Sequence, residues 1–378
     1  MLGVMLLVAG GGTALQSVPR RDALTQLGGG AAAAAAPGLV SPPRANAATI
    51  GQQQQQQQEL GKLGIGAWAW GDTLFWGYDS NNDNELRETF DFVANSKAGF
   101  IDTAEVYGFG RSETLVGDFS KAAGDFKVAT KFAPLPWRTT SADVVKACEA
   151  SLKRLDRDAI DLYQIHFPNA WSNRAYWSGL VECVEKNLVK AVGVSNYGVE
   201  ATTAVRDVLA KRGIPLASNQ IQYSLLYRYP EDNGLLATCR NLGVDVLAYS
   251  PLALGLLTNK FTRENAVLPA GPRKALVQTY LADDRFVSLQ GVLDQIATAH
   301  ASTPAAVSLN WTRAKGTIPI AGARNLRQAK ANLAALDWDL DADEILLLDN
   351  AARNLPWLGI KPPFAEKDIF TGMKMFDS

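Results

Sequence analysis

The sequence has few of the side chains from which metal sites and disulfide scaffolds are built. Its 378 residues include two histidines, His166 and His300, and three cysteines, Cys148, Cys183 and Cys239. The cysteines are far apart and form no CxxC pair, which argues against a disulfide scaffold and against a cysteine zinc site. A metal site built from histidine ligands is also poorly supported, because the chain has two histidines. We therefore expect chemistry that needs no metal ion.

The sequence also lacks an excess of charge of either sign. Its 37 lysines and arginines and 38 aspartates and glutamates give a net charge of −1. A strongly basic chain would have indicated nucleic acid or an anionic membrane surface as partner. We expect a small-molecule role, with no nucleic-acid partner and no membrane insertion of the mature protein. Nothing in the pattern indicates an oligomeric state.

Residues 1–58 differ in composition from the rest of the chain. The apolar run Met1–Ala9 is too short to span a bilayer. It is followed by Arg20 and Arg21, by an Ala/Gly-rich stretch, and by the A-x-A site at residues 45–47. These features are typical of export and organelle-targeting leaders. We predict a leader that directs the protein to a plastid, either the stroma or the thylakoid lumen. The alternative is an alanine-rich tail without a targeting role.

A glutamine tract, Gln52–Gln58, separates this leader from the remainder, and we interpret it as a disordered spacer. Residues 59–378 are expected to form one barrel domain with a C-terminal extension. From Leu60 onward, short apolar runs alternate with amphipathic segments of about a dozen residues, which predicts parallel strands joined by helices. The segment Ala142–Leu155, for example, has its apolar residues on one helical stripe.

Eight strands are predicted, and no G-x-G-x-x-G follows the first of them. Their ranges are Leu63–Trp70, Gly99–Ala104, Lys127–Phe132, Asp161–Phe167, Val189–Ser195, Leu216–Gln222, Val244–Ser250 and Gly316–Ile320. Eight strand–helix units predict an α/β fold, a (β/α)8 TIM barrel with parallel strands. In such a barrel the active site lies in the loops that follow the C-terminal ends of the strands.

Four chemically active side chains lie where three neighbouring predicted strands end. Asp102 and Tyr107 follow the second strand, Lys131 ends the third, and His166 ends the fourth. Each alone has a structural explanation as a cap, a packed ring or a surface side chain. Their joint placement favours a catalytic role. It suits carbonyl reduction, which needs a proton donor beside the carbonyl oxygen.

A tyrosine with an ordinary pKa near 10 is a slow proton donor at neutral pH. We expect the Lys131 cation to favour the phenolate of Tyr107, and the Asp102 carboxylate to keep the lysine charged. His166 can then donate a hydrogen bond to the carbonyl oxygen of the substrate. The four side chains together form a coherent acid catalyst.

The chain from about Leu60 to Leu348 resembles the aldo-keto reductases, and within them the plastid-located plant and algal members known only as oxidoreductases. Eight ordered segments carry the resemblance, namely Leu63–Gly71, Phe100–Gly117, Ala129–Phe132, Asp161–Asn169, Lys190–Tyr197, Ser218–Leu226, Ala248–Lys260 and Thr317–Asn332. It implies that Tyr107 is the general acid and that Asp102, Lys131 and His166 complete a tetrad. The implied reaction is NADPH-dependent reduction of an aldehyde or ketone.

The resemblance also implies which residues hold the cofactor NADP(H). Ser195, Asn196 and Gln220 would orient the nicotinamide carboxamide and Tyr249 would stack on the ring. Ser250, Leu252, Gly255 and Lys260 would cover the pyrophosphate. Arg324 and Gln328 would reach the 2′-phosphate, for which a guanidinium is a good match, and Asn332 would contact adenine.

The chain departs from the family pattern at three places. Glutamines stand where an N-terminal hairpin usually closes the barrel floor, so we expect a less complete floor. Asn259 replaces a usual glycine, and asparagine tolerates a positive φ. Ala321 replaces a usual proline. The tetrad itself is intact.

Aromatic residues in the strand-end loops suggest apolar or planar carbonyl substrates. Those expected at the substrate are Trp68, Trp70, Trp76, Phe132, Trp137 and Trp171. Some of them have packing in the core as the alternative. The alternative function is an NADPH-binding regulatory or redox-sensing subunit on the same barrel, with little turnover. The substrate itself cannot be named from the sequence.

Overall fold

The structure is a computed structural model that describes residues 60–121, 126–169, 171–265, 267–269 and 273–357. The chain divides into two units, Met1–Gln55 and Gln56–Ser378. The leader and the spacer predicted over residues 1–58 lie outside the described residues, as does the C-terminal tail from residue 358. The fold described below belongs to the second unit.

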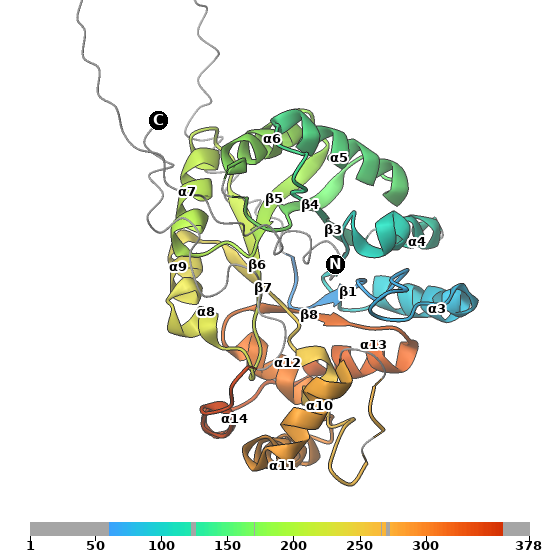
Figure 1. Cartoon of the computed structure of the whole chain (residues 1–378), viewed down its shortest axis with the longest axis vertical. Coiled ribbons are helices and arrows are strands. Elements are labelled where there is room, and N and C mark those ends of the chain that lie inside the picture. Colours follow the sequence, from blue (N-terminus) through green and yellow to red (C-terminus); the bar gives the residue numbers. More distant parts are fainter. Residues whose placement is uncertain (1–59, 122–125, 170, 266, 270–272, 358–378) are drawn as a thin grey trace, which may run out of the picture. The chain divides into compact units, whose positions relative to one another are not determined.

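Eight parallel strands form a closed barrel in sequence order, with β1 pairing both β2 and β8 (Figure 1). The strands are β1 Gly64–Gly66, β2 Phe100–Asp102, β3 Lys127–Phe132, β4 Ile160–Ile165, β5 Val189–Ser195, β6 Leu216–Gln222, β7 Asp245–Tyr249 and β8 Ile318–Gly322. The predicted (β/α)8 fold is confirmed. Three strands have the predicted bounds.

The first strand is much shorter than the sequence predicted. Strand pairing stops at Gly66, and the Trp70 amide then donates to the Ala67 carbonyl at 2.9 Å, which turns the chain out of the sheet. The apolar run Leu63–Trp70 thus contains a turn. Ala67 still donates its amide to the Asp102 carbonyl oxygen at 2.8 Å, whereas the Trp70 ring packs near Phe90 and Phe119 of the surrounding helices.

Helices cross between the strands and surround the barrel (Figure 1). They are α3 Asp83–Ala94, α4 Arg111–Ser120, α5 Ser141–Leu155, α6 Asn173–Glu185, α7 Val199–Ala210, α8 Tyr229–Asp232, α9 Leu235–Leu242, α10 Arg273–Ala282, α11 Asp284–Ala299, α12 Pro304–Ala314, α13 Leu326–Leu333 and α14 Ala342–Ala352. Short 3-10 helices are η1 Ser80–Asn82, η2 Tyr107–Gly110, η3 Ala253–Thr258 and η4 Ala334–Leu336.

Helix α5 illustrates how local sequence sets these elements. Thr140 accepts a hydrogen bond from the Asp143 amide while the Asp143 side chain binds the Thr140 amide, and this capping box starts the helix. Its apolar stripe, which includes Val144, Cys148 and Leu155, is buried against the barrel and α6. The helix predicted over Ala142–Leu155 is therefore present with one further residue.

The interior of the barrel toward its N-terminal end is filled by a separate apolar cluster. It comprises Leu60, Phe100, Ala129, Leu162, Ala217, Leu247 and Ile320, all buried. Leu60, which precedes β1, is only 2% exposed. The chain just before the first strand thus places an apolar side chain in the floor, the region where the sequence led us to expect incomplete closure.

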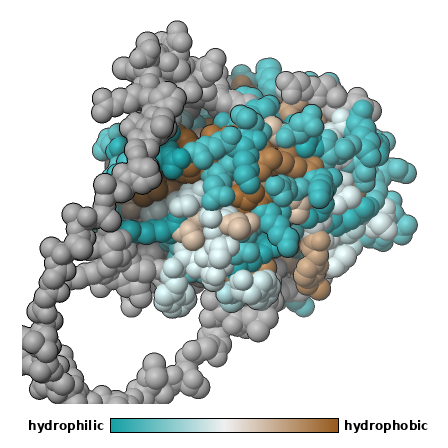
Figure 2. Space-filling view, turned by 90° about the horizontal axis from the view of Figure 1, so that it is seen from above, coloured by the Kyte–Doolittle hydropathy of each residue, from teal (hydrophilic) through white to brown (hydrophobic). Residues whose placement is uncertain are grey.

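Most of the described surface in Figure 2 is hydrophilic, with hydrophobic residues visible in patches between polar ones. Among the described residues, no helix combines the length and the apolar character that crossing a membrane requires. All three cysteines are buried and free.

Candidate active site

The ends of β2, β3 and β4 bring the four predicted catalytic side chains together. Asp102 is the last residue of β2, Lys131 is in β3, and His166 directly follows β4. Tyr107 begins η2 and is followed by Gly108, whose φ is +54°. A Cβ at Gly108 would lie 2.4 Å from the Gly71 carbonyl oxygen, so glycine lets the Tyr107 loop pack on the loop after β1.

Lys131 is the centre of the group. Its Nζ atom donates to Asp102 Oδ1 at 2.5 Å, to the Thr103 carbonyl oxygen at 2.8 Å and to Tyr107 Oη at 3.5 Å. The side chains of Lys131 and Asp102 are 0% and 4% exposed. An ion pair this deeply buried is only retained when each charge has compensating partners. Gln220 Nε2 supplies one by donating to Asp102 Oδ2 at 2.8 Å.

His166 lies beside Tyr107, with the two ring centroids 5.7 Å apart and the ring planes nearly perpendicular. Burial lowers the pKa of His166 well below its ordinary value, and the charge of Lys131 lowers it further. The imidazole is therefore neutral at physiological pH. Its Nδ1 atom is buried and has no hydrogen-bond partner among the described residues.

The electrostatics of Tyr107 differ from the expectation based on the residue types. Burial raises the pKa of Tyr107 well above its ordinary value, and the carboxylate of Asp102 raises it further. The Lys131 ammonium, 2.5 Å from Asp102 Oδ1 and 3.5 Å from Tyr107 Oη, does not outweigh these two effects on the pKa of Tyr107. Burial also lowers the pKa of Lys131, although Asp102 opposes this shift. Tyr107 is consequently a protonated donor at neutral pH.

The residues expected at the nicotinamide are also brought together, by β5, β6 and β7. Asn196 Nδ2 donates to Ser195 Oγ and to the His166 carbonyl oxygen, each at 3.1 Å. Tyr249 Oη donates to Asn196 Oδ1 at 2.9 Å. Asn196 has a φ of +62°. Because Gln220 contacts Asp102, these amides form one hydrogen-bonded group with the tetrad.

The residues expected along the phosphates lie in the loops after β7 and β8. Ser250, Leu252, Gly255 and Lys260 occur in or beside η3, where the backbone has several positive φ angles. Asn259, the unusual residue of this loop, has a φ of +51°, as its tolerance of that conformation predicts.

After β8, the Arg324 amide donates to Gln328 Oε1 at 2.8 Å. Asn332 is 2% exposed, and its Nδ2 donates to the Gly322 carbonyl oxygen at 3.1 Å. The first contact links the loop after β8 to the first turn of α13, and the second links the last turn of α13 to the end of β8.

The six aromatic residues predicted at the substrate do not form one group. Trp68 stands 6.2 Å from Tyr107 between ring centroids, and its indole packs on Trp76 at 5.4 Å. Trp137 and Trp171 are 74% and 85% exposed, in the loops after β3 and β4. These four lie at or near the mouth.

Trp70 and Phe132 are placed differently, since both are 0% exposed. Trp70 Nε1 donates to the Ala323 carbonyl oxygen at 2.7 Å, and its ring packs near Phe90 and Phe119. Phe132 packs on Tyr176. Both rings stabilise the scaffold around the site. Apolar periodicity alone does not separate such residues from pocket residues.

Two carboxylates that the sequence reasoning left out organise the mouth. Glu105 Oε1 accepts from the Ala133 amide at 2.7 Å and from Arg138 Nη1 at 2.5 Å, which ties the loop after β2 to the loop after β3. Asp72 accepts from Trp68 Nε1 and from the Phe75 amide. Glu105 lies between Asp102 and Tyr107 in the sequence, and from this position its place at the mouth could be predicted.

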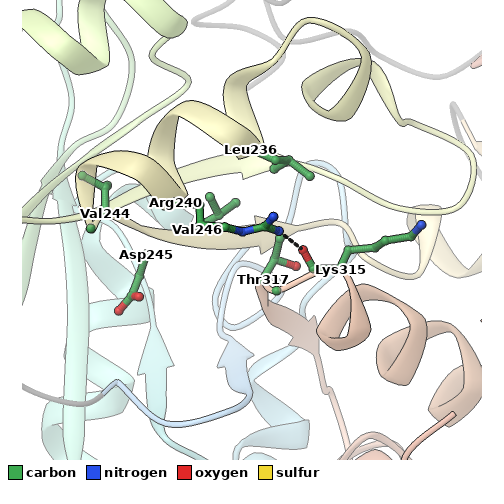
Figure 3. Close-up of a pocket in the computed structure, with 9 residues that line it drawn as sticks. Leu236, Arg240, Val244, Asp245, Val246, Lys315 and Thr317 are labelled. Carbon is green, nitrogen blue, oxygen red and sulfur yellow. Dashed lines mark hydrogen bonds between the residues drawn. The ribbon is translucent and has the colours of Figure 1, made fainter. Parts of the chain in front are cut away.

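A cavity of about 310 Å³ lies at the opposite end of the barrel, where β7 and β8 begin (Figure 3). Arg240, Asp245, Lys315 and Thr317 line it, and Arg240 Nη2 donates to the Lys315 carbonyl oxygen at 3.4 Å. It contains none of the tetrad. Among the described residues, no three His, Cys, Asp or Glu side chains are grouped as a metal site would require.

Comparisons with known proteins agree with this geometry. The model of the family described as "Aldo/keto reductase family" matches residues 62–353. The chain is 41% identical over 317 residues to the chloroplastic pyridoxal reductase of Arabidopsis thaliana, covering 79% of this chain and 85% of that protein.

Two solved structures have the same fold. The glycerol dehydrogenase of Gluconobacter oxydans is 27% identical with a TM-score of 0.69, covering 80% of this chain and 94% of that one. An aldo-keto reductase from Klebsiella pneumoniae in complex with NADPH is 25% identical with a TM-score of 0.62, covering 79% of this chain and 92% of that one. With its match over residues 62–353, this chain belongs to the aldo/keto reductase family of oxidoreductases.

Proposed function

We propose that this protein is an NADPH-dependent reductase that converts an aldehyde or ketone to the alcohol, with Tyr107 as the proton donor. The observation that carries the proposal is the position of Lys131 Nζ, 2.5 Å from Asp102 Oδ1 and 3.5 Å from Tyr107 Oη, in a buried site at the strand ends. Bound NADPH supplies hydride to the carbonyl carbon. The chain itself must then deliver a proton to the oxygen.

Each side chain of the tetrad has a physical task in that step. Tyr107 keeps its proton at neutral pH because burial raises the pKa of its hydroxyl, and it gives up this proton only as negative charge develops on the substrate oxygen. Lys131 stabilises the phenolate that is left. Neutral His166, whose ring centroid is 5.7 Å from that of Tyr107, donates a hydrogen bond to the same oxygen.

Several groups around the tetrad fit a nicotinamide dinucleotide. The amides of Asn196 and Gln220 and the hydroxyl of Ser195 form a polar group beside Asp102, which suits a carboxamide. Gln164 is fully buried and both polar atoms of its side chain lack partners among the described residues. Several residues of η3 have positive φ angles, a backbone conformation that can form a concavity for phosphate oxygens.

For the substrate, we propose a planar aromatic aldehyde, with pyridoxal as the first compound to test. The indole of Trp68, stacked on Phe75 and 6.2 Å from Tyr107, offers a flat apolar wall beside the proton donor. Offset stacking on such a wall favours planar rings. The relative from Arabidopsis thaliana, which is named a pyridoxal reductase, supports the same choice.

We also propose that the protein acts in a plastid. The leader pattern of residues 1–58 and the chloroplastic relative support this location. Fluorescent tagging of the full chain tests it, with a variant in which Arg20 and Arg21 are changed to lysine. A lumenal signal that depends on the two arginines indicates twin-arginine export, a stromal signal in both proteins indicates retention there, and a cytosolic signal contradicts the proposal.

The activity is tested with purified protein and a panel of pyridoxal, 4-nitrobenzaldehyde and methylglyoxal, each with NADPH and with NADH. We expect NADPH oxidation with at least the planar aldehydes. Changing Tyr107→Phe removes the proton and should lower kcat by about 10²–10⁴-fold while NADPH still binds. Binding of NADPH without turnover on any carbonyl would instead favour the regulatory or sensing subunit.

A further inference from the structure

Trp76, in the loop after β1, lies between two arginines from other loops. The guanidinium carbon of Arg273 is 4.7 Å from the centroid of the Trp76 ring, and that of Arg324 is 5.7 Å away. Arg324 Nη1 also approaches the Trp76 carbonyl oxygen at 3.5 Å. Arg273 begins α10, and Arg324 follows β8. Three loops of the mouth therefore meet at one indole.

The charges of this cluster are not neutralised by the described part of the chain. Neither Arg273 nor Arg324 forms an ion pair with a carboxylate among the described residues, whereas Arg111 pairs with Asp83 and Arg138 with Glu105. The pKa of Arg273 is lowered, first by burial and then by the positive charge of Arg324. Cation–π attraction to one indole offsets only part of this repulsion.

The cluster also contains an unused hydrogen-bond donor. Trp76 Nε1 is buried and has no partner among the described residues. Two partly buried cations that repel each other and one unpaired N–H donor form a site that is electrostatically complementary to an anion with several acceptor oxygens. A phosphate monoester dianion meets that description, whereas a carbonyl substrate does not.

We propose that Arg273 is a second arginine ligand of the cofactor 2′-phosphate beside Arg324, and that Trp76 fastens the loop after β1 over it. This inference rests on the proposed function, because it names how the same site selects NADPH. It moves Trp76 from the substrate group, where the sequence placed it, to the phosphate end of the cofactor. Trp76 still contacts Trp68, so the two ends are linked through packed rings.

The proposal makes the preference for NADPH depend on two arginines from different loops. A bound dianion compensates both charges and removes their repulsion. NADH, which lacks the 2′-phosphate, leaves both cations uncompensated. Loss of Arg273 should therefore weaken the binding of NADPH and leave that of NADH nearly unchanged.

The test compares Arg273→Gln with Lys274→Gln, which removes the same charge from the next, exposed residue. Dissociation constants for NADPH, NADH and 2′,5′-ADP are measured by calorimetry on the full chain, after thermal unfolding has shown that each variant is folded. 2′,5′-ADP carries the 2′-phosphate without nicotinamide, so its binding reports the phosphate site independently of turnover.

We expect Arg273→Gln to weaken NADPH and 2′,5′-ADP about tenfold or more and NADH less than twofold, with Lys274→Gln like the wild type. Arg273→Lys should fall between, since it keeps the charge but loses the planar fork. Trp76→Leu should speed NADPH release severalfold in stopped-flow fluorescence, and Trp76→Phe should do so less.

Equal 2′,5′-ADP affinity in the wild type and Arg273→Gln would overturn this inference and leave the proposed function standing. A wild-type protein that binds neither NADPH nor 2′,5′-ADP would instead remove the proposed function, and this inference with it.

Discussion

The mouth and the floor of the barrel are built by the same eight strands but on opposite physical principles. The floor is an apolar cluster, from Leu60 to Ile320, in which side chains fill the interior. The mouth contains the buried Lys131–Asp102 pair and buried polar atoms of Gln164 and His166 without partners among the described residues.

Backbone strain follows the same division. Of the nine described non-glycine residues with positive φ, six lie in loops after strand ends, namely Phe109, Asn196, Ser250, Ala253, Leu254 and Asn259. Unpaired buried polar groups and left-handed backbone lower stability and are kept where function requires them. The comparison teaches that the floor holds the mouth in a geometry that the mouth would not maintain alone.

The largest effect is expected when the buried ion pair of the mouth is replaced by apolar side chains like those of the floor. Lys131→Met alone leaves Asp102 buried without its partner and should lower the free energy of unfolding by about 3–5 kcal/mol. Asp102→Leu combined with Lys131→Met leaves no unpaired buried charge and should recover part of that loss, although Gln220 Nε2 loses its acceptor, with kcat reduced at least about 10³-fold. Urea unfolding and NADPH oxidation assays measure both quantities. A double variant that turns over substrate, or that is as unstable as Lys131→Met, contradicts the comparison.

The second expected effect comes from a substitution in the floor of the barrel, which should lower stability without changing the activity. Leu60→Ala removes a side chain that is 2% exposed and should lower the free energy of unfolding by about 2–3 kcal/mol. Because Leu60 is at the opposite end of the barrel from Tyr107, kcat and KM should not change below the melting temperature. Leu74→Ala, at a position 76% exposed in the loop after β1, is the matched control for leucine truncation and should leave stability within about 0.5 kcal/mol. A fall in kcat for Leu60→Ala would show that the floor does reach the site.

The third effect concerns pH and the neutral imidazole at the mouth. The pKa of His166 is well below its ordinary value in the folded protein and near 6.5 when unfolded, so only the unfolded chain takes up this proton as the pH falls through 6.5. The stability that His166 contributes is therefore present above that pH and lost below it. Between pH 7.5 and 5.5 the free energy of unfolding should fall by up to about 1.4 kcal/mol from this cause.

Urea unfolding of the wild type and of His166→Gln at both pH values measures this contribution. The decrease in stability between the two pH values should be smaller in the variant by about that amount. His300→Gln, which changes the other histidine of the chain, should leave the His166 contribution in place. An identical pH dependence in the wild type and His166→Gln would show that the pKa of His166 is not lowered in the folded protein.

The smallest effect is expected at the cavity of the floor. Arg240→Gln removes the 3.4 Å contact with the Lys315 carbonyl oxygen, at an exposed position. The free energy of unfolding should change by less than about 0.5 kcal/mol, and kcat/KM should stay at the wild-type value. Reduced turnover in this variant would show that the floor cavity has a functional role, and would contradict the division between a catalytic mouth and a structural floor.

Much of the barrel could be predicted because its signals are local. Alternation of apolar runs with helical stripes depends on neighbouring residues, so β3, β5, β6 and α5 were found within one residue of their bounds. The predicted first strand is longer than β1 because Ala67 and Trp70 are as apolar as strand residues. The turn between them, and the packing of Trp70 near Phe90 and Phe119, are features of the folded barrel.

The candidate site could likewise be predicted only in part. The sequence by itself determined which side chains stand at the ends of strands, and therefore that Asp102, Tyr107, Lys131 and His166 share the mouth of the barrel. Only the tertiary structure decided that Tyr107 is buried beside the Asp102 carboxylate, so that its pKa is raised rather than lowered. It also decided that Trp70 is buried in the scaffold, and that Arg273 lies against Trp76 although the two residues are 197 positions apart in the chain. Burial and distance between loops are properties of the closed barrel, and no local pattern of residues encodes them.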